Sequence, residues 1–188
     1  MRPLCIYIHG FNSSGNAAKS RLLKQALHHL SLDYHSPDLP HASSTAMATL
    51  RALCDDQRPL IFVGSSLGGF YACYLAHQYP DSRAVLINPA LRPWSLYKEM
   101  QKDYENVFTG EKFAITQKDI EEIRQFEVTA IHKPERFLLL LQTDDEVLNY
   151  QESLMKFPDS PKIVRHGGGH LFTDFEHVLP QVIEFIQG

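Results

Sequence analysis

The chain has few cysteines and no long apolar run, and both scarcities narrow the classes of protein to which it could belong. Only three of its 188 residues are cysteine, at positions 5, 54 and 73. An odd number of cysteines in apolar surroundings favours buried thiols in a reducing compartment over a disulfide framework. The apolar run near the N-terminus is too short to span a bilayer and lacks a cleavage-site pattern. We therefore expect a cytoplasmic protein that does not enter a membrane.

The chain also lacks an excess of basic charge. Its formal net charge at pH 7 is -4, and its isoelectric point is near 6.2. Such a chain offers no electrostatic attraction for nucleic acid or an anionic membrane surface, so neither is expected as a partner. The sequence has ten histidines, but no pair has a spacing typical of metal ligands. A metal ion is therefore not expected.

The most informative segment is an apolar run at 60–64 that leads into Gly-x-Ser-x-Gly at 64–68 and a second apolar stretch. This order predicts a strand, a tight turn and a helix, which would place Ser66 at a strained elbow above the end of a parallel strand. Gly64 and Gly68 would let the strand and helix backbones pass close together. Ser66 is therefore a candidate nucleophile, although a glycine-rich turn with an exposed serine is the alternative interpretation.

An elbow of this kind predicts an acid and then a histidine later in the chain, each after a strand. The apolar run at 136–142 is followed by Asp144, Asp145 and Glu146, and a shorter run at 162–165 leads through a triglycine to His170. A serine hydroxyl needs a base to take its proton, and histidine titrates in the right range. A carboxylate on the other ring nitrogen fixes the histidine tautomer.

We predict that Ser66 is the nucleophile, His170 the general base and acid, and Asp145 the orienting acid. Asp145 is preferred because the apolar pair Val147-Leu148 follows it at a suitable offset, and Asp144 is the second choice. Three adjacent acids could instead belong to a solvated loop or a helix N-terminus, where acids are favoured.

Two backbone N–H groups are candidates for an oxyanion hole. One belongs to Leu67, the residue after the nucleophile. The other belongs to Phe11, in the His9-Gly10-Phe11 loop that follows an apolar strand at 4–8. Asn12, in the same loop, is a candidate for contacting the substrate.

With these motifs, the chain resembles the α/β-hydrolases and, more narrowly, the small bacterial YqiA-type and YcfP-type esterases. The similar blocks lie in the same order over nearly the whole chain, at residues 9–14, 63–69, 88–93, 142–148 and 168–173. The resemblance implies carboxylic ester hydrolysis through an acyl-enzyme, with no cofactor, and it assigns nucleophile, acid and base to Ser66, Asp145 and His170. Asp144 stands where the family usually has glycine.

Strand and helix patterns alternate along the chain, which predicts a mostly parallel sheet with helices on both faces. The fold class is therefore α/β, as a three-layer α/β/α α/β-hydrolase fold in one domain over residues 1–188. Strands are predicted at residues 4–8, 33–36, 60–64, 83–88, 136–142 and 162–165. Helices are predicted at residues 16–30, 44–55, 67–79, 117–128, 149–156 and 174–187.

Residues 91–132 interrupt this alternation with a polar, aromatic-rich stretch, and a small cap or lid over the site is one interpretation. Packing of surface helices is the other. Trp94 is a candidate for contacting the substrate. Arg92 could hold a substrate carboxylate or phosphate, or form a salt bridge to an acid in the cap.

The sequence therefore favours a serine esterase that acts on small-molecule esters. Small or short-chain acyl groups are expected, because a short chain with a modest cap leaves limited room. The same triad could serve an acyl-thioester (acyl-CoA) hydrolase or an acyltransferase. A binding module without catalysis is the interpretation from a different class, and it would predict a missing triad residue. The sequence gives no signal for an oligomeric state.

Overall fold

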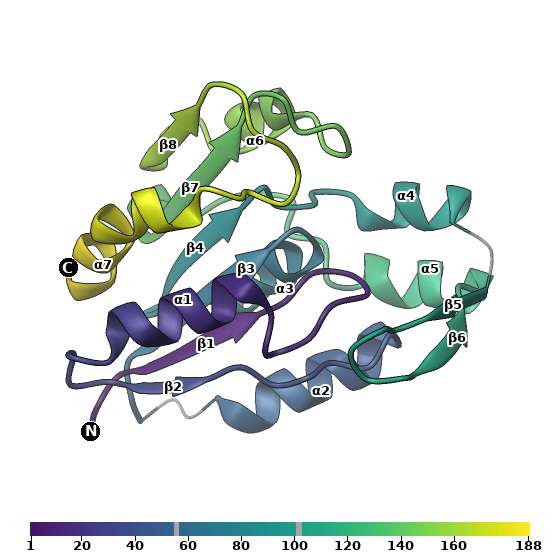
Figure 1. The fold of residues 1–188 in the computed structure, drawn as a ribbon, viewed down its shortest axis with the longest axis horizontal. Helices are drawn as coiled ribbons and strands as arrows, with labels where there is room; N and C mark the ends of the chain where they lie inside the picture. Colours follow the sequence, from purple (N-terminus) through teal and green to yellow (C-terminus); the bar gives the residue numbers. More distant parts are fainter. Residues whose placement is uncertain (55–56, 101–102) are drawn as a thin grey trace.

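The structure is a computed structural model that describes residues 1–54, 57–100 and 103–188. Within these residues, the central sheet contains six strands, which are β1 (Leu4–Ile8), β2 (Asp33–His35), β3 (Leu60–Ser65), β4 (Arg83–Ile87), β7 (Phe137–Gln142) and β8 (Lys162–Arg165). Their order across the sheet is β2-β1-β3-β4-β7-β8, and neighbouring strands are parallel (Figure 1). The predicted parallel sheet is confirmed.

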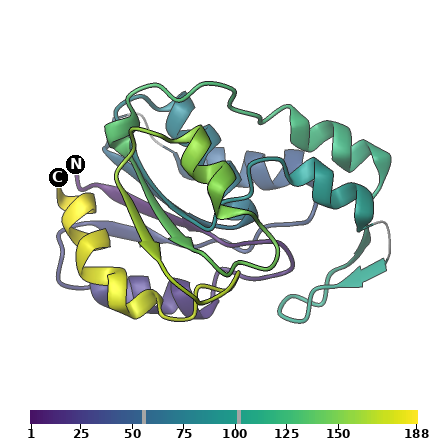
Figure 2. The same cartoon turned by 90° about the horizontal axis from the view of Figure 1, so that it is seen from above.

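Helices cover both faces of this sheet and complete a three-layer arrangement (Figure 2). One face carries α1 (Ala18–Leu27) and α7 (Leu179–Gln187), which contact each other. The opposite face carries α2 (Ser43–Leu53), α3 (Leu67–Gln78) and α6 (Tyr150–Lys156). The two ends of the chain lie at the same end of the molecule (Figures 1 and 2).

The apolar pattern of the strands explains these layers. Side chains of a strand point alternately to its two faces. In β1, Leu4, Ile6 and Ile8 join the hydrophobic cluster beneath α2 and α3, whereas Cys5 and Tyr7 join the cluster beneath α1 and α7. Strands β1, β3 and β7 are buried over their whole length, as expected for strands covered on both faces.

Several helices are shorter than predicted. The helix predicted at 16–30 extends only over α1, and the helix predicted at 44–55 ends at Leu53, with residue 55 outside the described residues. The helix predicted at 174–187 is divided into the 3-10 helix η2 (Phe175–Val178) and α7. Pro180 explains this division, because its ring would clash with a carbonyl one turn back in a continuous α-helix. Among the described residues, no helix has the length and apolar character needed to cross a bilayer.

In its described residues, the segment 91–132 contains four elements, of which only the last was predicted. They are α4 (Pro93–Glu99), the antiparallel pair β5 (Asp103–Glu105) and β6 (Lys112–Ala114), and α5 (Gln117–Arg124), and they lie beyond one end of the sheet (Figures 1 and 2). The two strands have three residues each, too few to show a period of two in the sequence. Helix α5 was predicted to reach residue 128 and ends at Arg124. A further 3-10 helix, η1 (Pro134–Arg136), precedes β7.

Helix α3 approaches β1 and β3 so closely that only glycine fits at two contact positions. A Cβ atom on Gly68 would lie 1.9 Å from the carbonyl oxygen of Ile8, and one on Gly64 would lie 2.1 Å from the carbonyl oxygen of Gly68. Both obstacles are backbone atoms, which cannot rotate away as a side chain could. The Gly-x-Ser-x-Gly glycines are therefore required by the packing of α3 on the sheet.

Gly68→Ala is expected to lower the free energy of unfolding by about 3 kcal/mol or more, because the new methyl group must push α3 away from β1. Urea denaturation would measure this loss. Gly110→Ala is the matched control, since its Cβ would meet nothing within 4 Å and only its positive φ of 73° is unfavourable. That control should lose about 1 kcal/mol. Equal losses in the two variants would contradict the packing argument.

Candidate active site

Ser66 lies at the sharp turn between β3 and α3. Its backbone has a φ of 56° and a ψ of −116°, a conformation that is unfavourable for a residue with a side chain. The Ser66 N–H donates to the carbonyl of Ile87, and the Ser66 carbonyl accepts from Gly69, Phe70 and Ala90. These hydrogen bonds hold the strained turn in place and present the hydroxyl above the carboxyl end of β3.

A continuous chain of hydrogen bonds joins the three residues predicted to form a triad. His170 Nε2 lies 2.9 Å from Ser66 Oγ, and His170 Nδ1 lies 2.9 Å from Asp145 Oδ2 and 3.1 Å from Oδ1. Asp145 follows β7 and His170 follows β8, so all three side chains come from the carboxyl ends of strands. Because these ends meet at one edge of a parallel sheet, residues 104 positions apart in sequence become neighbours.

Asp145 is held as a buried carboxylate. Its side chain is only 2% exposed, and its Oδ1 also accepts from the N–H groups of Val147 and Leu148. Burial alone would raise the pKa of Asp145, but the hydrogen bonds from His170 and the two backbone N–H groups outweigh it and hold the pKa below its usual value. Asp144, the second choice for the acid, is exposed and bonds to the hydroxyl of its neighbour Thr143.

Three polar side chains that the sequence analysis did not single out as site residues hold the loop that carries His170. Asn88 Nδ2 donates to the carbonyls of Gly169 and His170, while its Oδ1 accepts from the N–H of Gln142. Gln142 Oε1 accepts from the Gly169 N–H, and Glu146 Oε2 accepts from the His170 N–H. A signal was present for Asn88 and Glu146, since one follows the strand β4 directly and the other lies beside the triad acid.

The loop after β1 brings a second backbone segment to the nucleophile. A Cβ on Gly10 would lie 3.3 Å from Ser66 Cβ, so this loop passes directly over the elbow. Among the described residues, the N–H groups of Phe11 and Leu67 have no protein acceptor. Leu67 lacks one because the first N–H groups of a helix have no intrahelical partner.

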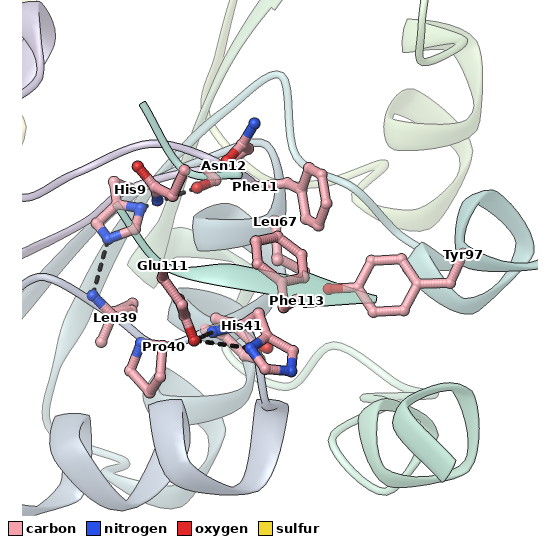
Figure 3. Close-up of a pocket in the computed structure, with 13 residues that line it drawn as sticks. His9, Phe11, Asn12, Leu39, Pro40, His41, Leu67, Tyr97, Glu111 and Phe113 are labelled. Atoms are coloured by element: carbon pink, nitrogen blue, oxygen red, sulfur yellow. Dashed lines mark hydrogen bonds and ion pairs between the residues drawn. The ribbon is translucent and has the colours of Figure 1, made fainter. Parts of the chain in front are cut away.

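The ring of Phe11 is fixed by three aromatic side chains from the segment 91–132. Tyr97, Tyr104 and Phe113 contact it edge-on, with ring centroids 5.9, 5.2 and 5.7 Å away. Figure 3 shows Phe11 beside Phe113, with Tyr97 reaching in from α4. Edge-on aromatic pairs of this kind typically contribute about 0.5–1.5 kcal/mol each. The segment 91–132 therefore anchors the loop that carries the Phe11 N–H.

His9 shapes this loop from within. Its Nε2 accepts from the Leu39 N–H at 3.0 Å, so its Nδ1 carries the proton and donates to the Gly10 carbonyl at 2.8 Å (Figure 3). Burial lowers the pKa of His9, which favours this neutral form. With both ring nitrogens occupied by backbone groups, His9 has no nitrogen left for proton transfer to a substrate.

A cavity of about 520 Å³ opens beside Ser66 and His170. Its walls are mainly apolar and come from both sides of the elbow: α1 and η2 supply Leu22 and Phe175, and α4 supplies Leu96 and Tyr97. Binding clefts for small molecules typically have about 300–1,000 Å³ and similar apolar linings. The arrangement thus places the Ser66 hydroxyl, the His170 imidazole and the residues Phe11 and Leu67 at the wall of an apolar cavity.

The three residues predicted to contact a substrate lie outside this cavity. Asn12 lines a smaller cavity of about 20 Å³ beneath the β1 loop (Figure 3), where its Oδ1 is buried without a hydrogen-bond partner among the described residues. Arg92 pairs with Glu152 of α6 at 2.8 Å and is 59% exposed. Trp94 is 7% exposed and packs against Phe70.

The position of Trp94 follows from the period of α4. Pro93, Leu96, Tyr97 and Met100 line the cavity, which is the i, i+3, i+4, i+7 face of a helix, and Trp94 lies on a neighbouring face. The sequence pattern did not predict a helix at these residues. The helical period could therefore not show that Tyr97, and not Trp94, faces the cavity. Tyr97 is the aromatic residue of α4 that reaches the cavity.

Comparison with known families agrees with this architecture. Residues 4–187 match the model of an uncharacterised protein family, UPF0227. The chain belongs to the UPF0227 family. The match covers β1, Ser66, Asp145 and His170, so the whole site described above lies within the family's boundaries.

Solved structures with the α/β-hydrolase fold are similar over almost the whole chain. Mouse alpha/beta hydrolase domain-containing protein 10 is 21% identical, with 98% of this chain and 89% of that chain covered and a TM-score of 0.74. Est1E from Butyrivibrio proteoclasticus, in a structure with bound ferulic acid, is 16% identical, with coverages of 98% and 88% and a TM-score of 0.71. A monoacylglycerol lipase from Paleococcus ferrophilus is 15% identical, with coverages of 97% and 93% and a TM-score of 0.71. The predicted α/β-hydrolase fold is confirmed.

Asn88→Ala should loosen the histidine loop, because it removes three hydrogen bonds and leaves the backbone groups of Gln142, Gly169 and His170 without their partner. A loss of about 2–4 kcal/mol in the free energy of unfolding is expected, together with faster hydrogen exchange at the Gln142 amide. Asn149→Ala is the control, since it removes only the N-cap of α6 and should cost about 1 kcal/mol. Unchanged exchange at Gln142 in Asn88→Ala would contradict this role.

Proposed function

We propose that the protein is a serine-dependent carboxylic ester hydrolase. The observation that carries this proposal is the unbroken chain of hydrogen bonds from Ser66 Oγ through His170 to the buried carboxylate of Asp145, beside an apolar cavity. A serine hydroxyl is a weak nucleophile, and a positioned imidazole is the base that activates it. A carboxylate on the far nitrogen keeps that imidazole in the tautomer that can accept a proton.

In the first half of the reaction, Ser66 Oγ attacks the ester carbonyl carbon as His170 Nε2 takes the hydroxyl proton. The bond between the carbonyl carbon and the alcohol oxygen then breaks, and the proton on His170 passes to that oxygen. The alcohol leaves, and the acyl group stays on Ser66 as an ester. Asp145 stabilises the imidazolium that exists between these two proton transfers, and its lowered pKa keeps it ionised at neutral pH.

In the second half, a water molecule attacks the acyl carbon while His170 Nε2 takes a proton from it. The bond to Ser66 Oγ breaks, the proton on His170 returns to the serine, and the carboxylic acid leaves. Both halves place a negative charge on the former carbonyl oxygen. The free N–H groups of Leu67 and Phe11 are the proposed donors to that oxygen, and one such donor typically contributes about 10²–10³-fold in rate.

The substrate is proposed to be a small-molecule ester with an apolar part that enters the 520 Å³ cavity. Two proteins of similar structure support esters as substrates, since one is a monoacylglycerol lipase and the other, Est1E, has been solved with bound ferulic acid. The segment 91–132 is proposed as the cap of this site, because α4 forms one wall of the cavity. Small or short-chain acyl groups remain the predicted substrates.

A fluorophosphonate probe tests whether Ser66 is activated. The folded protein should become labelled at Ser66, as located by peptide mass spectrometry, and should hydrolyse p-nitrophenyl butyrate. Ser66→Ala should abolish both signals, and His170→Ala should remove most of them, because no other base is bonded to the hydroxyl in the described residues. Ser65→Ala is the matched control, which should keep the label. A folded protein that is not labelled and has no esterase activity would favour a binding module.

The adjacent acids provide a second test. Asp145→Asn is expected to lower kcat about 10⁴-fold, because an amide stabilises the wrong histidine tautomer and cannot balance the imidazolium. Asp144→Asn should stay within about two-fold of the natural protein, since this side chain is exposed and faces Thr143. Initial rates with p-nitrophenyl butyrate would compare the two. A larger loss of kcat in Asp144→Asn than in Asp145→Asn would indicate that Asp144, and not Asp145, is the orienting acid.

A further inference from the structure

The large cavity beside Ser66 has one charged side chain in its wall besides the histidine of the triad. Among the described residues that line it, Lys19 is the only lysine or arginine, and no aspartate or glutamate is present. Other residues of the wall are small or apolar, among them Ala18 and Leu22 on the same helix and Phe172 in the histidine loop. Lys19 therefore gives the wall of this cavity a single positive charge and a preference for anionic groups.

Lys19 has no counterion in the described part of the chain. Its Nζ donates one hydrogen bond, to the carbonyl oxygen of Leu171, and no carboxylate lies within 4 Å of it. The side chain is half-buried, and burial lowers the pKa of Lys19 because the ammonium loses part of its hydration. A partly desolvated cation with two donor hydrogens left over would be stabilised by an anion in the cavity.

Lys19 lines the same cavity as Ser66 and His170, and the residue whose carbonyl it contacts, Leu171, directly follows His170 in the chain. An ester that reacts at Ser66 with its carbon chain in this cavity would therefore lie along the wall that contains Lys19. Because Lys19 is the only lysine or arginine among the described lining residues, its single positive charge balances a group with one negative charge, such as a carboxylate, better than a doubly charged phosphate.

We infer that Lys19 is a specificity-determining residue that selects esters carrying a free carboxylate close to the scissile bond, such as monoesters of short dicarboxylic acids. This inference rests on the proposed ester hydrolysis and deepens it. The apolar walls would hold the carbon chain of the substrate, and the Lys19 ammonium would hold its free carboxylate. The carbonyl of Leu171 keeps the ammonium in position before the substrate arrives.

Two p-nitrophenyl esters with the same number of acyl carbons test this inference, the neutral pentanoate and the anionic monoester of glutaric acid. The natural protein should prefer the glutarate monoester, as measured by the ratio of the two kcat/KM values. In Lys19→Met, which keeps the length of the side chain but removes its charge, this ratio should fall about 10- to 100-fold, mainly through KM for the anionic ester. Lys19→Arg should retain most of the preference.

Lys24→Met is the matched control, because Lys24 lies exposed on the same helix and does not line the cavity. It should leave the ratio of the natural protein unchanged. A Lys19→Met variant that loses the same factor with both esters would overturn the inference, since Lys19 would then act only by holding the Leu171 carbonyl. A natural protein without preference for the anionic ester would also overturn it. Failure of the proposed function itself is distinguishable, because neither ester would then be turned over in a Ser66-dependent way.

Discussion

The close approach of α3 to β1 is the constraint on which the rest of the site depends. Gly68 lies against the carbonyl of Ile8, and Gly64 lies against Gly68, so the chain must reverse from strand to helix within one residue. That residue is Ser66, which adopts a φ of 56° as a consequence. The backbone strain typical of functional sites is compensated here by packing and by hydrogen bonds to the Ser66 backbone.

Asp145 and His170, the other members of the proposed triad, reach Ser66 because parallel strands end at the same edge of the sheet. Asp145 is rigid, since it is buried and accepts two backbone N–H bonds in addition to that of His170. His170 lies in a glycine-rich loop with little structure of its own, and the side chains of Asn88 and Glu146 hold it from neighbouring strand ends. In the proposed mechanism, a positive charge on His170 would therefore meet a preorganised carboxylate, which avoids the cost of rearranging solvent or side chains.

The segment 91–132 serves two purposes in this arrangement. Helix α4 provides one wall of the cavity, and aromatic rings from α4, β5 and β6 enclose the ring of Phe11. The same contacts thus fix the shape of the cavity and the direction of the Phe11 N–H. Lys19, from α1, is the only lysine or arginine among the described residues that line this apolar space. The proposed roles of these residues thus divide between α1, for substrate selection, and the loop after β1, for stabilising the transition state.

The sequence by itself determined the central sheet, because apolar runs such as those of β3 and β7 are long enough to show burial on both faces. It also determined Ser66 and His170 as candidate catalytic residues and limited the acid to the adjacent Asp145 and Asp144, because strand ends and glycine turns are local signals. Only the tertiary structure decided which adjacent acid faces His170, which side of α4 lines the cavity, and that Arg92 turns to Glu152. The hairpin of β5 and β6 and the supporting role of Asn88 were also decided there. These features depend on contacts between residues far apart in sequence, and no local period or spacing encodes such contacts.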